Sequence, residues 1–238
     1  MNRLVMIVLK NIFRIPGFYG KLCRHAKHPE RYPEEERWAC IQRLLKIVMK
    51  SGNVELQVFG IETVPTEGGY LMYGNHQGLF DVVALGGTCP MPLATVYKKE
   101  LSDVPLLKQI LASTKSFAMD REDVRQSLTV IQAVTEEVRK GRRYIIFPEG
   151  TRSKKGNEMG DFHGGSFRCA VKAKCPIIPL AFVDCFRVLD QKGSGPVFAQ
   201  LHYLPPIPYE EYKDLKAAQI AELVKERIQQ VLDQARKG

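Results

Sequence analysis

The first candidate for chemistry is a histidine and an aspartate five positions apart in the stretch YGNHQGLFD. An apolar run ends at Tyr73, so we expect His76 in a turn and Asp81 in the helix that follows. From there the Asp81 carboxylate can fold back onto the imidazole, fix its tautomer and raise its basicity. The pair is therefore a candidate general base, although the spacing alone is a weak signal. A helix-capping aspartate beside a surface histidine is the alternative that the spacing leaves open.

A second candidate lies in the stretch YIIFPEGTRS, at residues 144–153. A buried strand runs into the sequence Pro-Glu-Gly, which predicts a rigid turn containing Glu149 and Gly150. Beyond the turn, Arg152 carries the planar guanidinium that matches the geometry of a phosphate group. The Thr151 hydroxyl and exposed turn amides can add hydrogen bonds. The stretch can therefore form a phosphate site, although composition alone favours a plain turn with a solvated arginine.

Two further basic residues follow the ends of short apolar runs. Arg121 closes the stretch KSFAMDR, and Lys98 follows a run that ends at Tyr97. Both are candidate phosphate ligands. The alternatives are an N-capping Asp120 beside an exposed arginine, and a solvated lysine.

These candidates depend on an alternation of strand-like and helical stretches after Gly52. Short runs rich in Val, Ile, Phe and Tyr predict strands at Val54–Phe59, Tyr70–Tyr73, Ala94–Tyr97, Phe117–Met119, Tyr144–Phe147, Ile177–Phe182 and Val197–Tyr203. Helical patterns predict helices at Leu79–Leu85, Leu106–Ala112, Glu122–Lys140, Ser166–Ala173 and Leu215–Ala235. This alternation is typical of an α/β domain with a mostly parallel central sheet flanked by helices, whose chemistry lies in the loops at strand ends.

The first 52 residues carry +7 of the chain's net charge of +9. At 100° per residue, Arg3, Lys10 and Arg14 share one side of a first helix whose other sides are apolar. This is the pattern of a helix that lies in a bilayer interface. The breakers in residues 14–20 end that helix, and a second helix is expected over Pro33–Met49. The N-terminus is therefore predicted to be a basic, amphipathic two-helix motif.

Two ordinary core helices are the alternative, but they leave the breadth of the apolar face unexplained. Nucleic acid is not an expected partner, because the basic residues are not interleaved with an aromatic platform. No apolar run approaches the roughly 20 residues of a membrane-spanning helix. No signal-peptide core with a cleavage site is present either, which predicts a protein of the cytoplasm.

Several other classes of site are not expected from the residues present. The six cysteines are scattered without a C-x-x-C pair, which predicts reduced thiols instead of a disulfide frame or zinc site. His76 and Asp81 supply only two metal ligands, and no other cluster has metal-ligand spacing, so no metal is expected. A hydrolase is disfavoured because no G-x-S-x-G sequence occurs.

Taken in order, the motifs resemble those of the glycerolipid acyltransferase family. The chain has N-H-x-x-x-x-D, then D-R at the end of a strand, then F-P-E-G-T-R-S, then P-I-I-P. Within the family, the chain is most similar to the bacterial 1-acyl-sn-glycerol-3-phosphate acyltransferases. The resemblance covers residues 54–205, and the basic N-terminus resembles the membrane-docking motif of short bacterial members. It implies a docking motif over 1–52 and an α/β acyltransferase domain over 53–238.

The resemblance implies that an acyl chain moves from an acyl thioester to the sn-2 hydroxyl of 1-acyl-sn-glycerol-3-phosphate, giving phosphatidic acid. His76 would be the general base, and Asp81 would orient it and stabilise the imidazolium. The acyl group would move directly, without an acyl-enzyme. No cofactor is implied beyond the donor, which is acyl-CoA or acyl-carrier protein. The expected location is the cytoplasmic face of the membrane, on an anionic surface.

The resemblance also assigns the phosphate-bearing acceptor to residues of these motifs, with Glu149 in acceptor binding. The full set is Arg152, Arg121, Lys98, Glu149, Gly150 and Thr151. Two positions depart from the family pattern: Lys115 stands where glycine is common, and Cys175 replaces an aliphatic residue. Neither departure removes a catalytic group, but Lys115 can alter how the acceptor is held.

Two other functions remain open at this point. The same chemistry can serve glycerol-3-phosphate, or a lyso-lipid without phosphate, although the latter leaves Arg152 and Arg121 without a partner. A different class of function is that of a non-catalytic protein of the membrane surface, whose basic helices bind the membrane. The presence of His76, Asp81 and Arg152 argues against it.

Overall fold

The computed structural model describes residues 2–120 and 123–235. Seven strands form one sheet in the order β1-β7-β6-β2-β5-β3-β4. The strands are β1 (Val54–Phe59), β2 (Tyr70–Gly74), β3 (Ala94–Lys98), β4 (Phe117–Met119), β5 (Arg143–Ile146), β6 (Ile177–Val183) and β7 (Val197–Tyr203). All neighbours are parallel except β6 and β7. The prediction of a mostly parallel α/β sheet is confirmed, and each predicted strand is present within one residue at either end.

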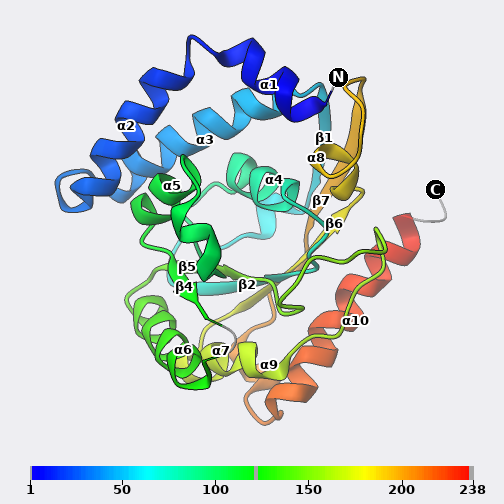
Figure 1. Ribbon diagram of the computed structural model, residues 1–238. Coiled ribbons are helices and arrows are strands. Elements are labelled where there is room, and N and C mark those ends of the chain that lie inside the picture. Colours follow the sequence, from blue (N-terminus) through cyan, green and yellow to red (C-terminus); the bar gives the residue numbers. More distant parts are fainter. Residues whose placement is uncertain (1, 121–122, 236–238) are drawn as a thin grey trace.

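Helices cover both faces of the sheet (Figure 1). They are α1 (Arg3–Asn11), α2 (Ile15–Lys27), α3 (Glu34–Ser51), α4 (Phe80–Thr88), α5 (Leu107–Ser113), α6 (Val124–Arg139), α7 (Arg168–Ala173), α8 (Phe186–Leu189), α9 (Tyr209–Tyr212) and α10 (Ala217–Ala235). Figure 1 shows α3, α4 and α5 on one side of the sheet and α6, α7, α9 and α10 on the other. The central strands β2 and β6 are buried along their whole length, as continuous apolar strands between two helical layers should be.

The two layers enclose separate apolar cores. One core packs Val130, Val134 and Val138 of α6 and the inner face of α10 against the sheet. The other packs Trp38 and Ile41 of α3 and much of α4 against the opposite face. At 25 cal/mol per Å² of buried apolar surface, these cores are the main source of stability and hold the strand ends in register.

The N-terminal region differs from the prediction of two helices. The chain does turn at residues 12–14, but a further helix, α2, begins at Ile15 and runs through the expected breakers. Pro16 lies in the first turn of α2, where a missing N–H costs no helical hydrogen bond. Gly17 and Gly20 follow in the same helix, and a Cβ at either would have no atom of another part of the chain within 4 Å. The region therefore contains three helices, α1, α2 and α3. In Figure 1, α1 and α2 lie outside α3 on the side of the sheet that α3, α4 and α5 cover.

Arg3 also lies elsewhere than predicted. Instead of joining an exposed cationic stripe, its side chain is buried and donates to the carbonyl oxygens of Gly52, Val188 and Gly195. These bonds anchor α1 to the rest of the fold. The outer face of α1 remains apolar and exposed through Leu4, Val5, Val8, Leu9, Ile12 and Phe13.

The structure shows the surroundings of Lys115 and Cys175, the two departures from the family pattern. Lys115 follows α5 and has a φ of 53°, in the left-handed region that favours glycine. Its effect on the acceptor stays a prediction. Cys175 is buried in the core beside α7, where a thiol packs as a small apolar group.

Candidate active site

The predicted contact between His76 and Asp81 is present in the structure. His76 lies in the loop after β2, and Asp81 lies in the first turn of α4. The distance from His76 Nδ1 to Asp81 Oδ2 is 2.7 Å. An ionised carboxylate only accepts hydrogen bonds, so Nδ1 carries the proton and Nε2 is left as the basic nitrogen.

Asp81 is fully buried, and its surroundings keep the carboxylate in one position. Besides the imidazole, Oδ2 accepts the backbone N–H groups of Gln77 at 2.6 Å and Gly78 at 2.9 Å. Burial raises the pKa of Asp81, while the bonds from His76 and the two amides oppose that rise. The carboxylate is therefore a rigid acceptor that holds the imidazole.

The segment after β5 holds His76 from the other side. The imidazole stacks on the Phe147 ring, with 4.1 Å between the ring centroids. The His76 N–H donates to Glu149 Oε1 at 2.7 Å, and the His76 carbonyl accepts the Ser153 N–H at 2.8 Å. The His76 side chain is 20% exposed, so the ring is fixed but still open to a substrate.

The three middle residues of the FPEGTRS stretch differ in their surroundings. Glu149 is buried, and its second oxygen accepts the Gly160 N–H at 2.8 Å. Burial raises the pKa of Glu149. Gly150 has a φ of 71° and closes a turn through its N–H to the Phe147 carbonyl, which explains the need for glycine. Thr151 is exposed on the outside of the turn.

Arg152 is half exposed and pairs with a residue that the sequence did not single out. Its guanidinium lies 3.0 Å from Asp190 Oδ1, just after α8. The other oxygen of Asp190 accepts the Leu79 N–H at the start of α4. Asp190 therefore joins Arg152 to the loop that carries His76.

Of the other two basic candidates, only Lys98 lies within the described residues, and it contacts a glutamate instead of joining Arg152. Lys98 lies at the exposed end of β3, and its ammonium group is 2.8 Å from Glu100. In the sheet order β5 separates β3 from β2, the strand that leads to His76. Arg121 lies outside the described residues. Phosphate binding by either residue stays a prediction.

Sequence reasoning also missed a polar network that ties three loops together. Gln77, beside His76, donates to Asn157 Oδ1 at 2.6 Å and accepts the Cys185 N–H. Asn157 in turn donates to Asp184 at 2.9 Å. These residues lie about 30 to 110 positions apart along the chain, so no local pattern could have revealed them. The network fixes the loops after β2, β5 and β6 against each other.

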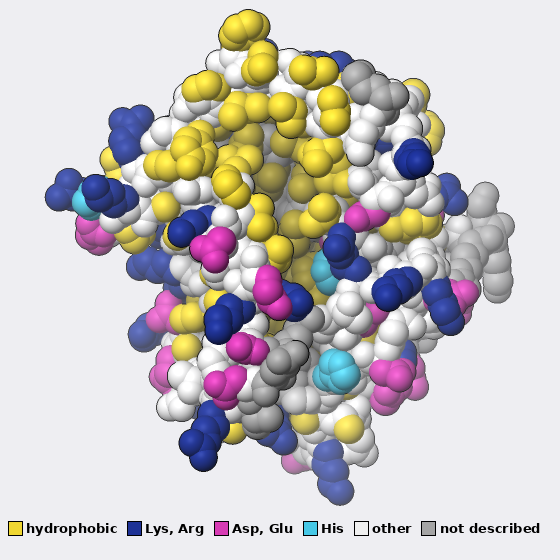
Figure 2. All heavy atoms as spheres, in the orientation of Figure 1, with side chains coloured by type: hydrophobic (Ala, Val, Ile, Leu, Met, Phe, Trp, Pro, Cys, Tyr) yellow, Lys and Arg dark blue, Asp and Glu magenta, His cyan; other side chains and the backbone are white. Residues whose placement is uncertain are grey.

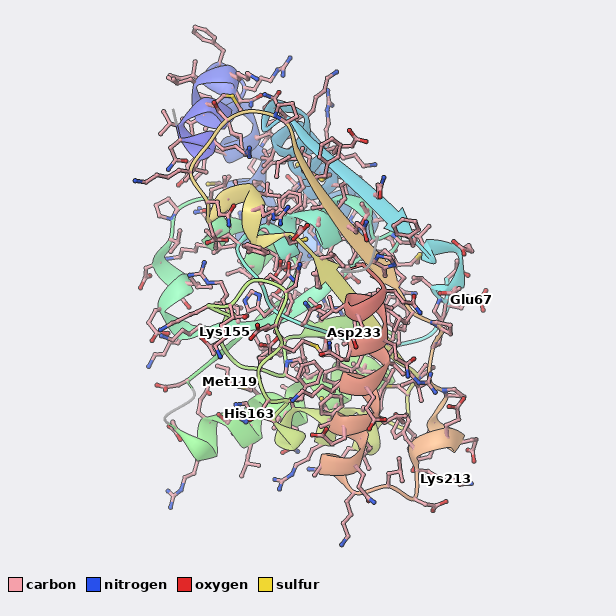
Figure 3. All side chains as sticks on the ribbon, turned by 90° about the vertical axis from the view of Figure 1, so that its right-hand side faces the viewer. Glu67, Met119, Lys155, His163, Lys213 and Asp233 are labelled. Atoms are coloured by element: carbon pink, nitrogen blue, oxygen red, sulfur yellow. The ribbon has the colours of Figure 1, made fainter. Side chains whose placement is uncertain are left out.

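The molecular surface is hollowed on the face drawn in Figure 2. Figure 2 shows hydrophobic side chains lining this hollow from the region of α1 and α2 to a histidine near the middle of the face. Leu79, just before α4, and Val82 on α4 are exposed although they are large apolar residues. Figure 3 labels Lys155 and His163 on the long segment between β5 and α7, which borders the site. The hollow fits a substrate with an apolar chain.

No group of three metal-ligating side chains that could hold an ion occurs within residues 2–120 and 123–235. Together, the fold and the site define an α/β protein with a hydrogen-bonded histidine–aspartate pair whose loop is joined to an arginine through Asp190. The sequence profile of the acyltransferase family matches residues 55–183. The chain therefore belongs to the acyltransferase family.

Individual relatives agree with this family. A 1-acyl-sn-glycerol-3-phosphate acyltransferase of Helicobacter pylori is 31% identical over 52% of this chain and 53% of its own length. One of Saccharomyces cerevisiae is 27% identical over 79% of this chain and 62% of its own. The chain thus spans between about half and three fifths of these curated relatives. The crystal structure of the 1-acyl-sn-glycerophosphate acyltransferase of Thermotoga maritima has the same fold, with a TM-score of 0.80, 20% identity, and coverage of 98% of this chain and 95% of that one.

Proposed function

We propose that the protein transfers an acyl chain from an acyl thioester to the sn-2 hydroxyl of 1-acyl-sn-glycerol-3-phosphate, which gives phosphatidic acid. The observation that carries the proposal is the 2.7 Å contact between His76 and the buried Asp81, next to the loop of Arg152. A neutral imidazole fixed in one tautomer is suited to remove a proton from a hydroxyl. The names of the relatives support the choice of reaction and acceptor.

The reaction can proceed in one transfer without an acyl-enzyme. His76 Nε2 takes the proton of the acceptor hydroxyl as the oxygen attacks the thioester carbonyl carbon. Asp81 stabilises the imidazolium that forms. When the tetrahedral intermediate collapses, the C–S bond breaks and the imidazolium returns the proton to the departing thiolate. The base is restored, and the chain itself needs no cofactor beyond the acyl-CoA or acyl-carrier-protein donor.

Arg152 is the basic residue best placed to hold the acceptor phosphate. Its loop is bonded to the His76 carbonyl through the Ser153 N–H, so a phosphate on Arg152 brings the hydroxyls of the same molecule to the base. Thr151 adds an exposed hydroxyl to this loop. Arg121 and Lys98 are further proposed phosphate ligands, and Lys98 would have to leave Glu100 to act as one. A planar, bidentate guanidinium also favours a phosphate over an uncharged acceptor.

Replacing Arg152 with glutamine should raise the KM for lysophosphatidate by about 10- to 100-fold and change kcat far less, because a hydrogen bond to a charged group contributes about 1.5–3 kcal/mol. Steady-state kinetics in mixed micelles measure both constants. Arg168→Gln is the matched control, since Arg168 is exposed on α7. An unchanged KM in Arg152→Gln would remove the arginine from the phosphate site.

We also propose that the protein docks as a peripheral protein on the anionic cytoplasmic face of the membrane. Within the described ranges, no helix is long and apolar enough to cross a bilayer. Phe13 is 96% exposed at the end of the apolar face of α1. Behind this face, a groove of about 950 Å³ between α2 and α3 is lined by the cations Arg14, Lys21, Arg43, Lys46 and Lys50. None of these five forms an ion pair with another described residue, which suits lipid phosphates.

Replacing Leu9 and Phe13 together with serine should weaken binding to phosphatidylglycerol-containing vesicles by about 100-fold, since each buried apolar side chain contributes about 1.5–3 kcal/mol. Vesicle co-sedimentation measures the effect. Phe198→Ser is the control, because Phe198 is a large exposed apolar residue, 59% exposed against 57% for Leu9, but lies on β7. Binding that remains at the wild-type level would exclude α1 as the docking element.

A radiolabelled acyl-transfer assay in mixed micelles tests the function itself. It offers lysophosphatidate, glycerol-3-phosphate and a phosphate-free monoacylglycerol, each with acyl-CoA and with acyl-carrier protein. Phosphatidate as the main product supports the proposal and identifies the donor. Product from another acceptor alone would correct the substrate, and no product from any pair would favour the non-catalytic membrane protein.

A further inference from the structure

We propose that Glu149 is a positioning residue that fixes the backbone of the catalytic histidine, and that it does not contact the acceptor. The inference rests on the proposed acyl transfer, because it concerns how the base of that reaction is held. It departs from the acceptor-binding role that the family resemblance implies for this residue.

Both oxygens of Glu149 are already used by backbone groups. Oε1 accepts the His76 N–H at 2.7 Å, and Oε2 accepts the Gly160 N–H at 2.8 Å. The residue is 5% exposed. A substrate hydroxyl or phosphate has little access to such a carboxylate, and a phosphate would also meet a like charge.

The geometry explains why this position needs glutamate. Two N–H donors from separate loops converge on one side chain, so only a group with two acceptor oxygens satisfies both. Glutamine offers one oxygen and turns an amide N–H₂ toward the second donor. Gly160 leaves room for the contact, since a Cβ there would lie 2.9 Å from Glu149 Oε2.

Three residues of the segment after β5 contact His76, and Glu149 is one of them. The Phe147 ring supports the imidazole face, Glu149 accepts the His76 N–H, and Ser153 donates to the His76 carbonyl. The polar contact of the His76 imidazole is with Asp81. Backbone and ring are thus fixed independently, and a misplacement of about 1 Å can cost about 10²-fold in rate.

The first test compares Glu149→Gln with Glu158→Gln. Glu158 is an exposed glutamate of the same segment and serves as the matched control. If Glu149 positions the base, Glu149→Gln lowers kcat by about 100-fold and leaves the KM for lysophosphatidate within about twofold. A raised KM with an unchanged kcat would show contact with the acceptor and overturn the proposal.

A second variant addresses the case in which Glu149→Gln fails to fold. Gly160→Ala displaces the carboxylate without altering it, and it should lower kcat by about 10-fold with the KM unchanged. The double variant should be no slower than Glu149→Gln alone, because both changes disturb the same contact. Independent, additive effects would contradict the coupling.

A measurement without substrate separates this proposal from the proposed function. In protein labelled with ¹⁵N-histidine, the His76 ring resonances are identified by their loss in His76→Ala. They should shift or broaden in Glu149→Gln and remain unchanged in Glu158→Gln. If the wild type makes no phosphatidate but this change occurs, the function fails and the positioning role stands. Unchanged resonances would refute the positioning role whatever the activity.

Discussion

Replacement of His76 with alanine should lower kcat for acyl transfer by about 10³-fold, within the 10²–10⁴-fold range of a general base. The acceptor hydroxyl is a poor nucleophile while it keeps its proton, and His76 Nε2 is the basic nitrogen that the Asp81 contact leaves available. The KM for lysophosphatidate should change little, because the proposed phosphate ligand is Arg152 and not His76. Initial rates with saturating donor measure the loss.

His163→Ala is the matched control for this experiment. His163 is exposed on the segment that borders the site (Figure 3), and its hydrogen bonds to Pro148 and Ser166 are made by its backbone. It should retain wild-type activity. Transfer by His76→Ala at the wild-type rate would disprove the mechanism, and an equal loss in both variants would indicate general damage to the loops.

Replacement of Asp81 with asparagine should lower kcat by about 10²–10⁴-fold while His76 is still present. The asparagine amide can donate to Nδ1, which stabilises the opposite tautomer and puts the proton on Nε2, where the base is needed. The imidazolium also loses its counter-charge. The comparison of kcat in Asp81→Asn with kcat in His76→Ala shows how much of the base's effect depends on the carboxylate.

Asp81 also accepts two backbone N–H groups, so stability has to be measured beside activity. A thermal unfolding curve close to that of the wild type would assign the loss to chemistry. Asp103→Asn is the control, since Asp103 is 92% exposed and distant in the chain. If a folded Asp81→Asn kept full activity, the dyad would have no role in the reaction.

The sequence was informative where the interactions are local. Runs of β-branched and aromatic residues identified all seven strands, and the His76–Asp81 contact followed from one turn and one helix start. It was misleading at α2, because Pro16 interrupts a helix interior but is well tolerated in a first turn. Arg3 was placed on the surface because helical periodicity does not show that three distant carbonyls surround it.

The parts of the site that the sequence could not provide are the long-range ones. Asp190 stands 38 positions from Arg152, in a stretch with no motif. Glu149 and Gly160 are close together in the sequence. A glutamate in a turn can nevertheless be interpreted either as a substrate ligand or as a residue that fixes the backbone. Only the burial of its carboxylate and the two amides on it distinguish these roles.

The bonds of Arg3 have a consequence for the way the protein would sit on a bilayer. Two of them end on Val188 and Gly195, which bracket Asp190, and Asp190 contacts both Arg152 and the start of α4. Helix α1 and the loops that carry Arg152 and precede α4 therefore contact the same short segment of chain. On the proposed docking, the distance from the membrane plane to His76 is built into the molecule. On this proposal, a lipid acceptor must leave the membrane plane far enough for its hydroxyl to reach His76, and that distance is the same for every acceptor molecule.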